Sequence, residues 1–245
     1  MIETKVLKRL ANRYQTTMNN IVKEYFQHLF LSFLYREKKS ESLLFKGGTA
    51  LRLVWQSPRF SEDLDFSSSK ISIGQIESLM EAALEKVEGE GIKTDIKESK
   101  KTSGGYLAIF DFETSEYESG IQIEVSLRSQ PKNAGTTALI SSDLLPPYTM
   151  VHLDQERLVG EKIQACLTRA KPRDFYDLYF ILRSRMAFKE TFSQDKALKI
   201  KLLKVIDGQK FELKNELKRF LPSNQHTLLK NFKSTLLAEI QRSLP

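Results

Sequence analysis

Hydrophobic positions in the first 40 residues follow a helical pattern. Apolar residues between Ile21 and Leu34 recur at steps of three and four, which places them on one side of a helix. The same spacing predicts a helix over residues 75–90, where the pattern closes with two glycines. The many aromatic side chains of the first segment are therefore expected to pack in a core.

Between residues 43 and 66, the hydrophobic pattern predicts several short elements in close succession. A short apolar run at 43–45 leads into two glycines, and a helical pattern then continues to Trp55. Pro58 interrupts that helix, because proline removes a backbone donor and clashes with the preceding turn. Residues 59–66 are then expected to form a turn that leads into a strand.

The middle of the chain has the pattern of strands. Residues 92–99 alternate loosely, while 106–112 and 121–127 are short and rich in β-branched or aromatic residues. The polar stretch between the last two segments suits a hairpin.

Four prolines and glycines in residues 130–148 mark a boundary, after which the pattern is helical over 154–170, over 173–185 and through a lysine-rich end. The pattern thus predicts an α+β unit over residues 1–148 and an all-helical unit over 149–245.

Composition fits a globular protein without a membrane segment. Hydrophobic residues make up 40% and charged residues 28% of the 245 residues, and no apolar run reaches the roughly 20 residues of a membrane span. Cys166 is the single cysteine, which fits a reducing, cytoplasmic location and a buried, unreactive thiol. The three histidines share no motif with it, so any bound metal is expected to have oxygen ligands.

The net charge of +7 is concentrated near the end of the chain. Residues 189–245 hold 12 Lys/Arg and 6 Asp/Glu. A basic segment of this kind indicates a polyanion partner such as nucleic acid, and a solvated lysine-rich helical face is the competing interpretation. The candidate RNA contacts are Lys199, Lys201, Lys204, Lys210, Lys214 and Lys218.

Two aspartates separated by one residue are the first sign of chemistry. Successive strand side chains point to opposite faces, so Asp63 and Asp65 share one face, with α-carbons about 6–7 Å apart. Carboxylates this close repel each other, and a shared cation removes that cost. A solvated edge or turn is the alternative for such a pair.

Glu124 obeys the same alternation, since Ile121, Ile123 and Val125 take the other face of their segment. If its strand lies near Asp63, Glu124 completes a three-carboxylate cluster, which suits magnesium and phosphoryl chemistry. Taken alone, it would be a surface residue of a half-buried strand.

The glycine pair has a matching interpretation. Gly47 and Gly48 before a helix let the backbone approach an anion, and the helix offers free N–H groups at its positive end. The Thr49 hydroxyl can donate to a phosphate oxygen. No P-loop motif is present in the sequence.

These motifs together resemble a known family. KGGTAL, followed by RFSEDLDF, resembles the AbiEii/AbiGii toxin family of nucleotidyltransferases, which includes the MenT toxins. The glycine–hydroxyl pair followed by D-x-D is shared with DNA-polymerase-β-like nucleotidyltransferases. The later stretch LVGEKIQACLTRAKPRDFYDLYF is similar to the helical block of the AbiEii family. The resemblance implies a mixed sheet flanked by helices, followed by a helical domain.

The resemblance also assigns roles to residues. It implies metal ligation by Asp63, Asp65 and Glu124, with glutamate standing where aspartate is common in the family. Asp174 or Asp177 would be a further catalytic acid. The nucleotide would be bound by Lys46, Gly47, Gly48, Thr49, Ser61 and Lys162. Some MenT toxins are silenced by phosphorylation near the position of Ser61.

The implied activity is magnesium-dependent transfer of a nucleoside monophosphate from an NTP to the tRNA 3′ end, with a cognate antitoxin as partner. A protein acceptor, or a non-catalytic binding module, is the alternative. Within the helical block, a purely structural pairing of Arg169 or Arg173 with Asp174 is equally compatible with the residues.

Overall fold

The computed structural model describes residues 1–68, 71–127, 134–184, 186, 196–209 and 213–243, without the side chains of residues 196 and 213–215. The chain forms two compact units, Met1–Leu153 and Asp154–Pro245. The sequence pattern puts this boundary at residue 148. It lies after Leu153, because Tyr148–Leu153 forms a strand of the first unit's sheet.

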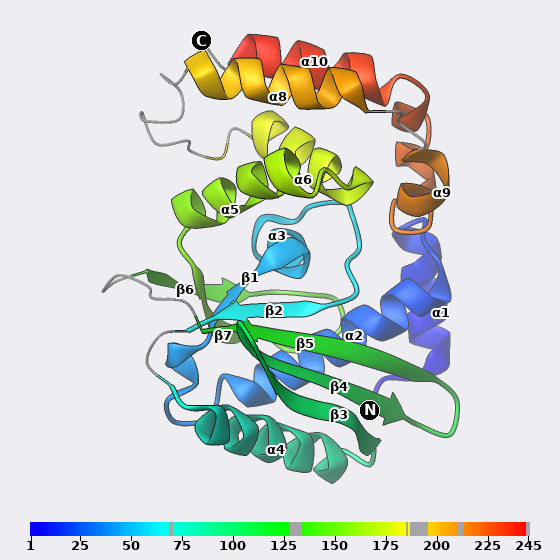
Figure 1. Cartoon of the computed structure of the whole chain (residues 1–245). Coiled ribbons are helices and arrows are strands. Elements are labelled where there is room, and N and C mark those ends of the chain that lie inside the picture. The colour runs from blue at the N-terminus through cyan, green and yellow to red at the C-terminus, as the bar shows by residue number, and fades with distance from the viewer. Residues whose placement is uncertain (69–70, 128–133, 185, 187–195, 210–212, 244–245) are drawn as a thin grey trace. The chain divides into compact units, whose positions relative to one another are not determined.

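A seven-stranded mixed sheet organises the first unit (Figure 1). Its order is β3-β4-β5-β2-β1-β7-β6. The pairs β2–β5 and β1–β7 are parallel, and the remaining neighbours are antiparallel. The strands are β1 (Leu44–Lys46), β2 (Leu64–Ser67), β3 (Lys93–Thr102), β4 (Gly105–Glu113), β5 (Glu118–Ser126), β6 (Gly135–Ile140) and β7 (Tyr148–Leu153). The α+β class and the predicted hairpin, β4–β5, are confirmed.

Helix α2 (Met18–Leu34) packs on this sheet through aromatic residues. Phe26 stacks on Phe112, and Phe30 lies against Phe110, with ring centroids 5.2 and 5.8 Å apart. In Figure 1, α4 lies along β3, and α3 lies over β1 and β2. The α-helices of the first unit are α1 (Thr4–Arg13), α2 (Met18–Leu34), α3 (Gly47–Trp55) and α4 (Ile73–Gly89). The predicted aromatic core of α2 is therefore present.

Two parts of the first unit differ from the sequence pattern. Gly47 and Gly48 are the first two residues of α3, whereas the pattern suggested a turn before it. Residues 130–148 contain strand β6, which pairs with β7 at the sheet edge, although their composition suggested only a linker.

The second unit is helical in the part of the chain that the structure describes. Tyr176 stacks on Phe232, with ring centroids 6.1 Å apart, which joins α6 to α10. The helices are α5 (Gln155–Thr168), α6 (Pro172–Arg183), α8 (Lys196–Gly208), α9 (Leu213–Lys218) and α10 (Phe232–Ser243), with short 3₁₀ turns at Ser223–Gln225 and Leu228–Lys230. None of the described helices in either unit is long and apolar enough to cross a membrane.

Candidate active site

Three charged residues lie in a row across the sheet of the first unit. Strand pairing sets Lys46 of β1 opposite Asp65 of β2, and Asp65 opposite Glu124 of β5. Residues directly paired on neighbouring strands point to the same face. The predicted proximity of the Glu124 strand to the aspartate pair is therefore correct.

Asp63 lies two residues before Asp65, directly before the start of β2. Asp63 and Asp65 are half-buried, and Glu124 is exposed. Gln122 lies two residues before Glu124, and its Nε2 donates to Glu124 Oε1 at 2.7 Å. Asp65 and Glu124 thus share one face, Asp63 lies directly before it, and the three differ in access to solvent.

The glycine pair is packed directly against this face. Gly47 has φ +84°, a left-handed conformation that favours glycine. A β-carbon on Gly47 would lie 2.0 Å from Asp65 Oδ2. A β-carbon on Gly48 would lie 2.4 Å from Arg59 Nη2 and 2.8 Å from Ser61 Oγ. Glycine is therefore favoured at position 47 by both its backbone and its neighbour Asp65, while a larger residue at position 48 would displace the ends of the Arg59 and Ser61 side chains.

Helix α3 begins at these glycines. Its N-cap residue, Lys46, gives the first turn no side-chain hydrogen bond within the described chain. The first N–H groups of a helix attract anions. This start of α3 is therefore compatible with a phosphate group taking the capping position.

Thr49 has a different role from the one predicted. Its hydroxyl is buried and donates to the Asp63 carbonyl at 2.5 Å. A hydroxyl has one proton to donate, so donation to a phosphate would require this bond to break. In this structure Thr49 holds the main chain of Asp63.

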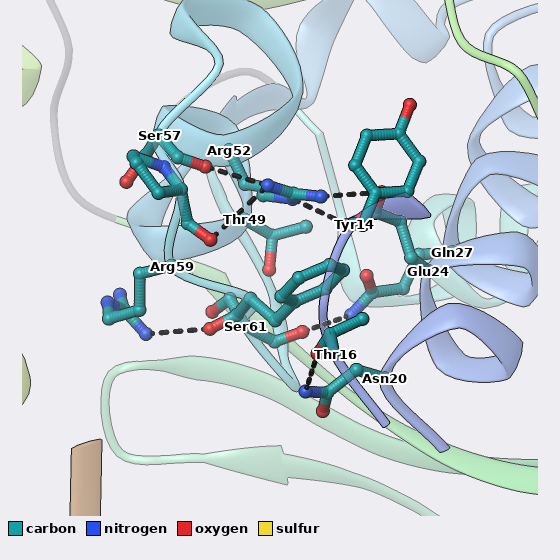
Figure 2. A network of polar contacts seen from close by, with 12 residues as sticks. Tyr14, Thr16, Asn20, Glu24, Gln27, Thr49, Arg52, Ser57, Arg59 and Ser61 are labelled. Carbon is teal, nitrogen blue, oxygen red and sulfur yellow. Dashed lines mark hydrogen bonds and ion pairs between the residues drawn. The ribbon is translucent and has the colours of Figure 1, made fainter. Parts of the chain in front are cut away.

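The connection from α3 to β2 carries Ser61 and Asp63 and is held by a polar network (Figure 2). Arg52 of α3 pairs with Glu24 of α2, with Nε 2.7 Å from Oε2. Gln27 of α2 donates to the carbonyls of the connection. Sequence patterns indicated none of these long-range contacts.

Magnesium is the metal that the predicted chemistry requires, and the donor set is partly suited to it. The candidate ligands, Asp63, Asp65 and Glu124, supply oxygen donors, which magnesium prefers. However, the described residues contain no group of three or more His, Cys, Asp or Glu side chains positioned to hold a metal. The carboxylates are therefore neighbours through their strands, while their side chains do not form a closed site.

Two candidate residues of the second unit form a buried ion pair. Lys162 Nζ on α5 lies 2.8 Å from Asp177 Oδ2 on α6, and their side chains are 9% and 2% exposed. When a cation and an anion are buried together, removing either one is strongly destabilising, because it leaves an unpaired charge away from water. In this structure, the predicted phosphate-binding lysine is paired with a predicted catalytic acid.

Asp174 has separate partners. Its carboxylate accepts from Arg169 Nε at 2.9 Å and Nη2 at 2.6 Å, and from the Lys171 N–H at 3.1 Å. Cys166 donates its S–H to the Asp174 carbonyl at 3.1 Å. Burial, and then the nearby Asp174 and Asp177 charges, raise the pKa of the Cys166 thiol. The pairing of Asp174 with Arg169 agrees with the structural interpretation, and the cysteine is buried as predicted.

The predicted RNA-contacting lysines divide by exposure. Lys201, Lys204 and Lys218 are exposed, and Lys199 is half-buried. Lys210 lies outside the described residues, as does the side chain of Lys214.

Sequence reasoning missed one buried residue beside the site. Arg59 is 3% exposed, and its Nη1 donates to the Phe60 carbonyl at 3.1 Å. Its position directly in the RFSEDLDF segment was the available signal. Arg59 thus adds a second cation, beside Gly48, to the row that contains Lys46, Asp65 and Glu124.

Solved structures share this fold. The chain is 24% identical to JHP933 from Helicobacter pylori, with a TM-score of 0.63. The match covers 93% of this chain and 92% of JHP933. The chain is 16% identical to the MenT4 nucleotidyltransferase toxin from Mycobacterium tuberculosis, with a TM-score of 0.65. That match covers 98% of this chain and 89% of MenT4. No curated protein matches the chain. The fold is that of the nucleotidyltransferase toxins.

The family follows from the sequence. The family described as nucleotidyl transferase AbiEii toxin, type IV toxin–antitoxin system, matches residues 30–242. The chain belongs to this AbiEii family and is a toxin nucleotidyltransferase. The predicted resemblance is thereby confirmed.

Proposed function

We propose that this toxin transfers a nucleoside monophosphate from an NTP to the 3′ end of a tRNA, with magnesium as cofactor. The observation that carries the proposal is the row Lys46, Asp65 and Glu124 on one sheet face, beside the glycine pair at the start of α3. The basic end of the chain supports an RNA acceptor.

Asp63, Asp65 and Glu124 would hold the metal, which neutralises phosphate charge and favours attack and departure at phosphorus. The α3 start, with Gly47 and Gly48, would bind phosphate oxygens through backbone N–H groups. These contacts position the nucleotide, which is the main task of a protein in phosphoryl transfer.

In the transfer itself, an acceptor hydroxyl oxygen forms a bond to the α-phosphorus. The bond from that phosphorus to the β-phosphate bridging oxygen breaks, and pyrophosphate leaves. Glu124, the most exposed of the three carboxylates, would accept the proton of the hydroxyl.

Lys162 would contact the nucleotide phosphates, which would offer the same kind of anionic partner that Asp177 offers now. Asp174 and Asp177 are both candidates for the late acid, Asp177 paired with Lys162 and Asp174 with Arg169 and the Lys171 N–H. Ser61 would lie near the bound nucleotide, because its hydroxyl is beside Gly48. A cognate antitoxin is the expected protein partner of a toxin of this family.

A labelling assay tests the proposal. Purified protein is incubated with magnesium, one α-labelled NTP at a time and total RNA, beside an Asp63→Ala control. Label in the tRNA band with the intact protein alone is the expected result, and it also identifies the nucleotide. Label in a protein band would move the acceptor to protein. No label with any of the four nucleotides would contradict the proposal.

A further inference from the structure

The connection between α3 and β2 has no regular structure, yet its backbone is extensively bonded (Figure 2). Irregular segments normally direct their carbonyl groups to water. Here, side chains donate to the carbonyl oxygens of Ser57, Pro58, Phe60, Ser61, Glu62 and Asp63. The segment that delivers Asp63 is thus fixed in place by side chains.

From α2, Gln27 contacts the two residues directly before Asp63, while Thr49 of α3 bonds the Asp63 carbonyl itself. Gln27 Nε2 donates to the carbonyls of Ser61 and Glu62, both at 3.0 Å. The Gln27 side chain is buried, being 1% exposed. A primary amide has two N–H donors, so one nitrogen can hold two consecutive carbonyls directly before Asp63.

Arg52 holds the first half of the connection. Its Nη1 donates to the Ser57 and Pro58 carbonyls at 3.0 and 3.3 Å, and its guanidinium lies 3.8 Å from the centroid of the Phe60 ring. Glu24 of α2 receives Arg52 Nε at 2.7 Å and Nη2 at 3.2 Å. The geometry of Arg52 is therefore set by α2.

Both α2 residues lie outside the part of the chain that matches the family, which begins at residue 30. Gln27 is 34 residues from Ser61 in sequence. The family match therefore assigns no role to them, while the structure joins both to the backbone before Asp63.

We propose that Gln27 is a positioning residue for Asp63, with the Glu24–Arg52 pair anchoring the start of the same connection. This inference rests on the proposed function of Asp63 as a metal ligand. A displacement of about 1 Å in a positioned group can lower a rate about 100-fold. Loss of the two Gln27 bonds would free the backbone beside Asp63 to shift by such an amount.

The test compares Gln27→Glu with Gln164→Glu in the full-length protein. Gln27→Glu keeps the shape of the side chain and removes both donors, whereas Gln164 is exposed on α5. Gln27→Met, which adds no charge, replaces Gln27→Glu if that variant does not fold. The three measurements are kcat and KM in the labelling assay, the melting temperature, and binding of Mn²⁺ alone followed by electron paramagnetic resonance.

For Gln27→Glu we expect a kcat lowered about 10- to 100-fold, an unchanged KM for tRNA and Mn²⁺ binding weakened about tenfold. Gln164→Glu should match the wild type. A Gln27 variant that melts earlier but keeps its kcat and Mn²⁺ binding would show a merely structural role and overturn the inference.

Asp63→Ala separates the inference from the proposal beneath it. If Asp63→Ala loses Mn²⁺ binding while the Gln27 variants keep it, only the positioning role is overturned. If Asp63→Ala binds Mn²⁺ like the wild type, the ligand role of Asp63 fails, and the positioning role fails with it.

Discussion

The two units treat their candidate site residues in opposite ways. In the first unit, Asp65 and Glu124 share one sheet face, Asp63 lies directly before β2, and all three are half-buried or exposed. In the second unit, Lys162 and Asp177 are buried and paired at 2.8 Å. Repelling carboxylates are thus kept near solvent, while opposite charges are buried together.

The difference teaches how each group can act. Like charges on a surface cost folding energy that a bound cation would recover, which agrees with the proposed metal-binding role of the first unit's carboxylates. A buried ion pair already contributes to the fold, and removing one member leaves an unpaired charge. In the second unit, the two residues with a proposed function, Lys162 and Asp177, are therefore also residues on which the stability of the fold depends.

Asp63→Asn should have the largest effect on activity. It removes one of the three carboxylate charges, and metal stabilisation of phosphoryl charge is worth several kcal/mol, so we expect nucleotide transfer to fall about 10³-fold or more. Fold stability should change little, because Asp63 is held by its backbone carbonyl. The labelling assay and a melting curve measure the two quantities.

Glu81→Gln, at an exposed position of α4, is the matched control and should keep full activity. If the Asp63→Asn variant stayed active, the carboxylate of Asp63 would not be essential. The proposed contrast, in which the first unit's carboxylates act on a ligand, would then fail at this position.

Asp177→Ala should have the largest effect on stability. It leaves Lys162 buried without its partner, so the free energy of unfolding should fall by about 3–5 kcal/mol. Urea denaturation measures this change. The double variant Lys162→Met, Asp177→Leu should recover most of the stability, because it removes both charges at once.

Activity of the double variant decides what the pair is for. We expect a stable but inactive protein, as the proposed phosphate contact of Lys162 would be lost. A double variant that is both stable and active would mean that the pair serves the fold alone.

Sequence patterns predicted the first unit's site face better than the second unit's pairing. Alternation along a strand fixes which residues share a face, so the row of Asp65 and Glu124 followed once β2 and β5 were neighbours. The contact between Lys162 and Asp177 depends on how two helices pack, which the spacing of 15 residues does not determine.

The contacts of Gln27 were inaccessible from sequence for a related reason. Its periodic neighbours indicate a buried helix face, but no local signal says that its partners are the carbonyls of Ser61 and Glu62. Strand β6 was not predicted from the sequence, because a segment that contains proline and glycine resembles a linker even when part of it pairs at a sheet edge.

pH should affect the stability of the first unit through His28. Burial, the largest cause, lowers the pKa of His28 to about 4, and Nδ1 of this ring lies 2.9 Å from the Tyr148 hydroxyl. The unfolded chain protonates near its ordinary pKa of about 6.5, while the folded protein stays neutral. Stability is therefore complete above about pH 6.5 and declines as the pH falls towards about 4.

The expected loss over that range is about 3 kcal/mol. His28→Gln keeps a polar group near Tyr148 and cannot be protonated, so its stability should decline less over the same range. Urea denaturation at several pH values measures both proteins. Equal pH slopes for the two would show that His28 makes no contribution.

The smallest effects are expected for two glycine variants, Gly47→Ala and Gly91→Ala. Their comparison distinguishes the cost of backbone strain from the cost of contact with the site. Gly47 and Gly91 have similar φ values, +84° and +79°, but a β-carbon on Gly91 meets nothing within 4 Å, whereas one on Gly47 would meet the Asp65 carboxylate. Each change to alanine should cost about 1–2 kcal/mol through φ. Gly47→Ala should cost more, and it should also lower activity by displacing Asp65, while Gly91→Ala leaves activity intact. Urea denaturation and the labelling assay give both differences. Equal activity losses would mean that the contact between Gly47 and Asp65 does not hold the carboxylate in place for catalysis.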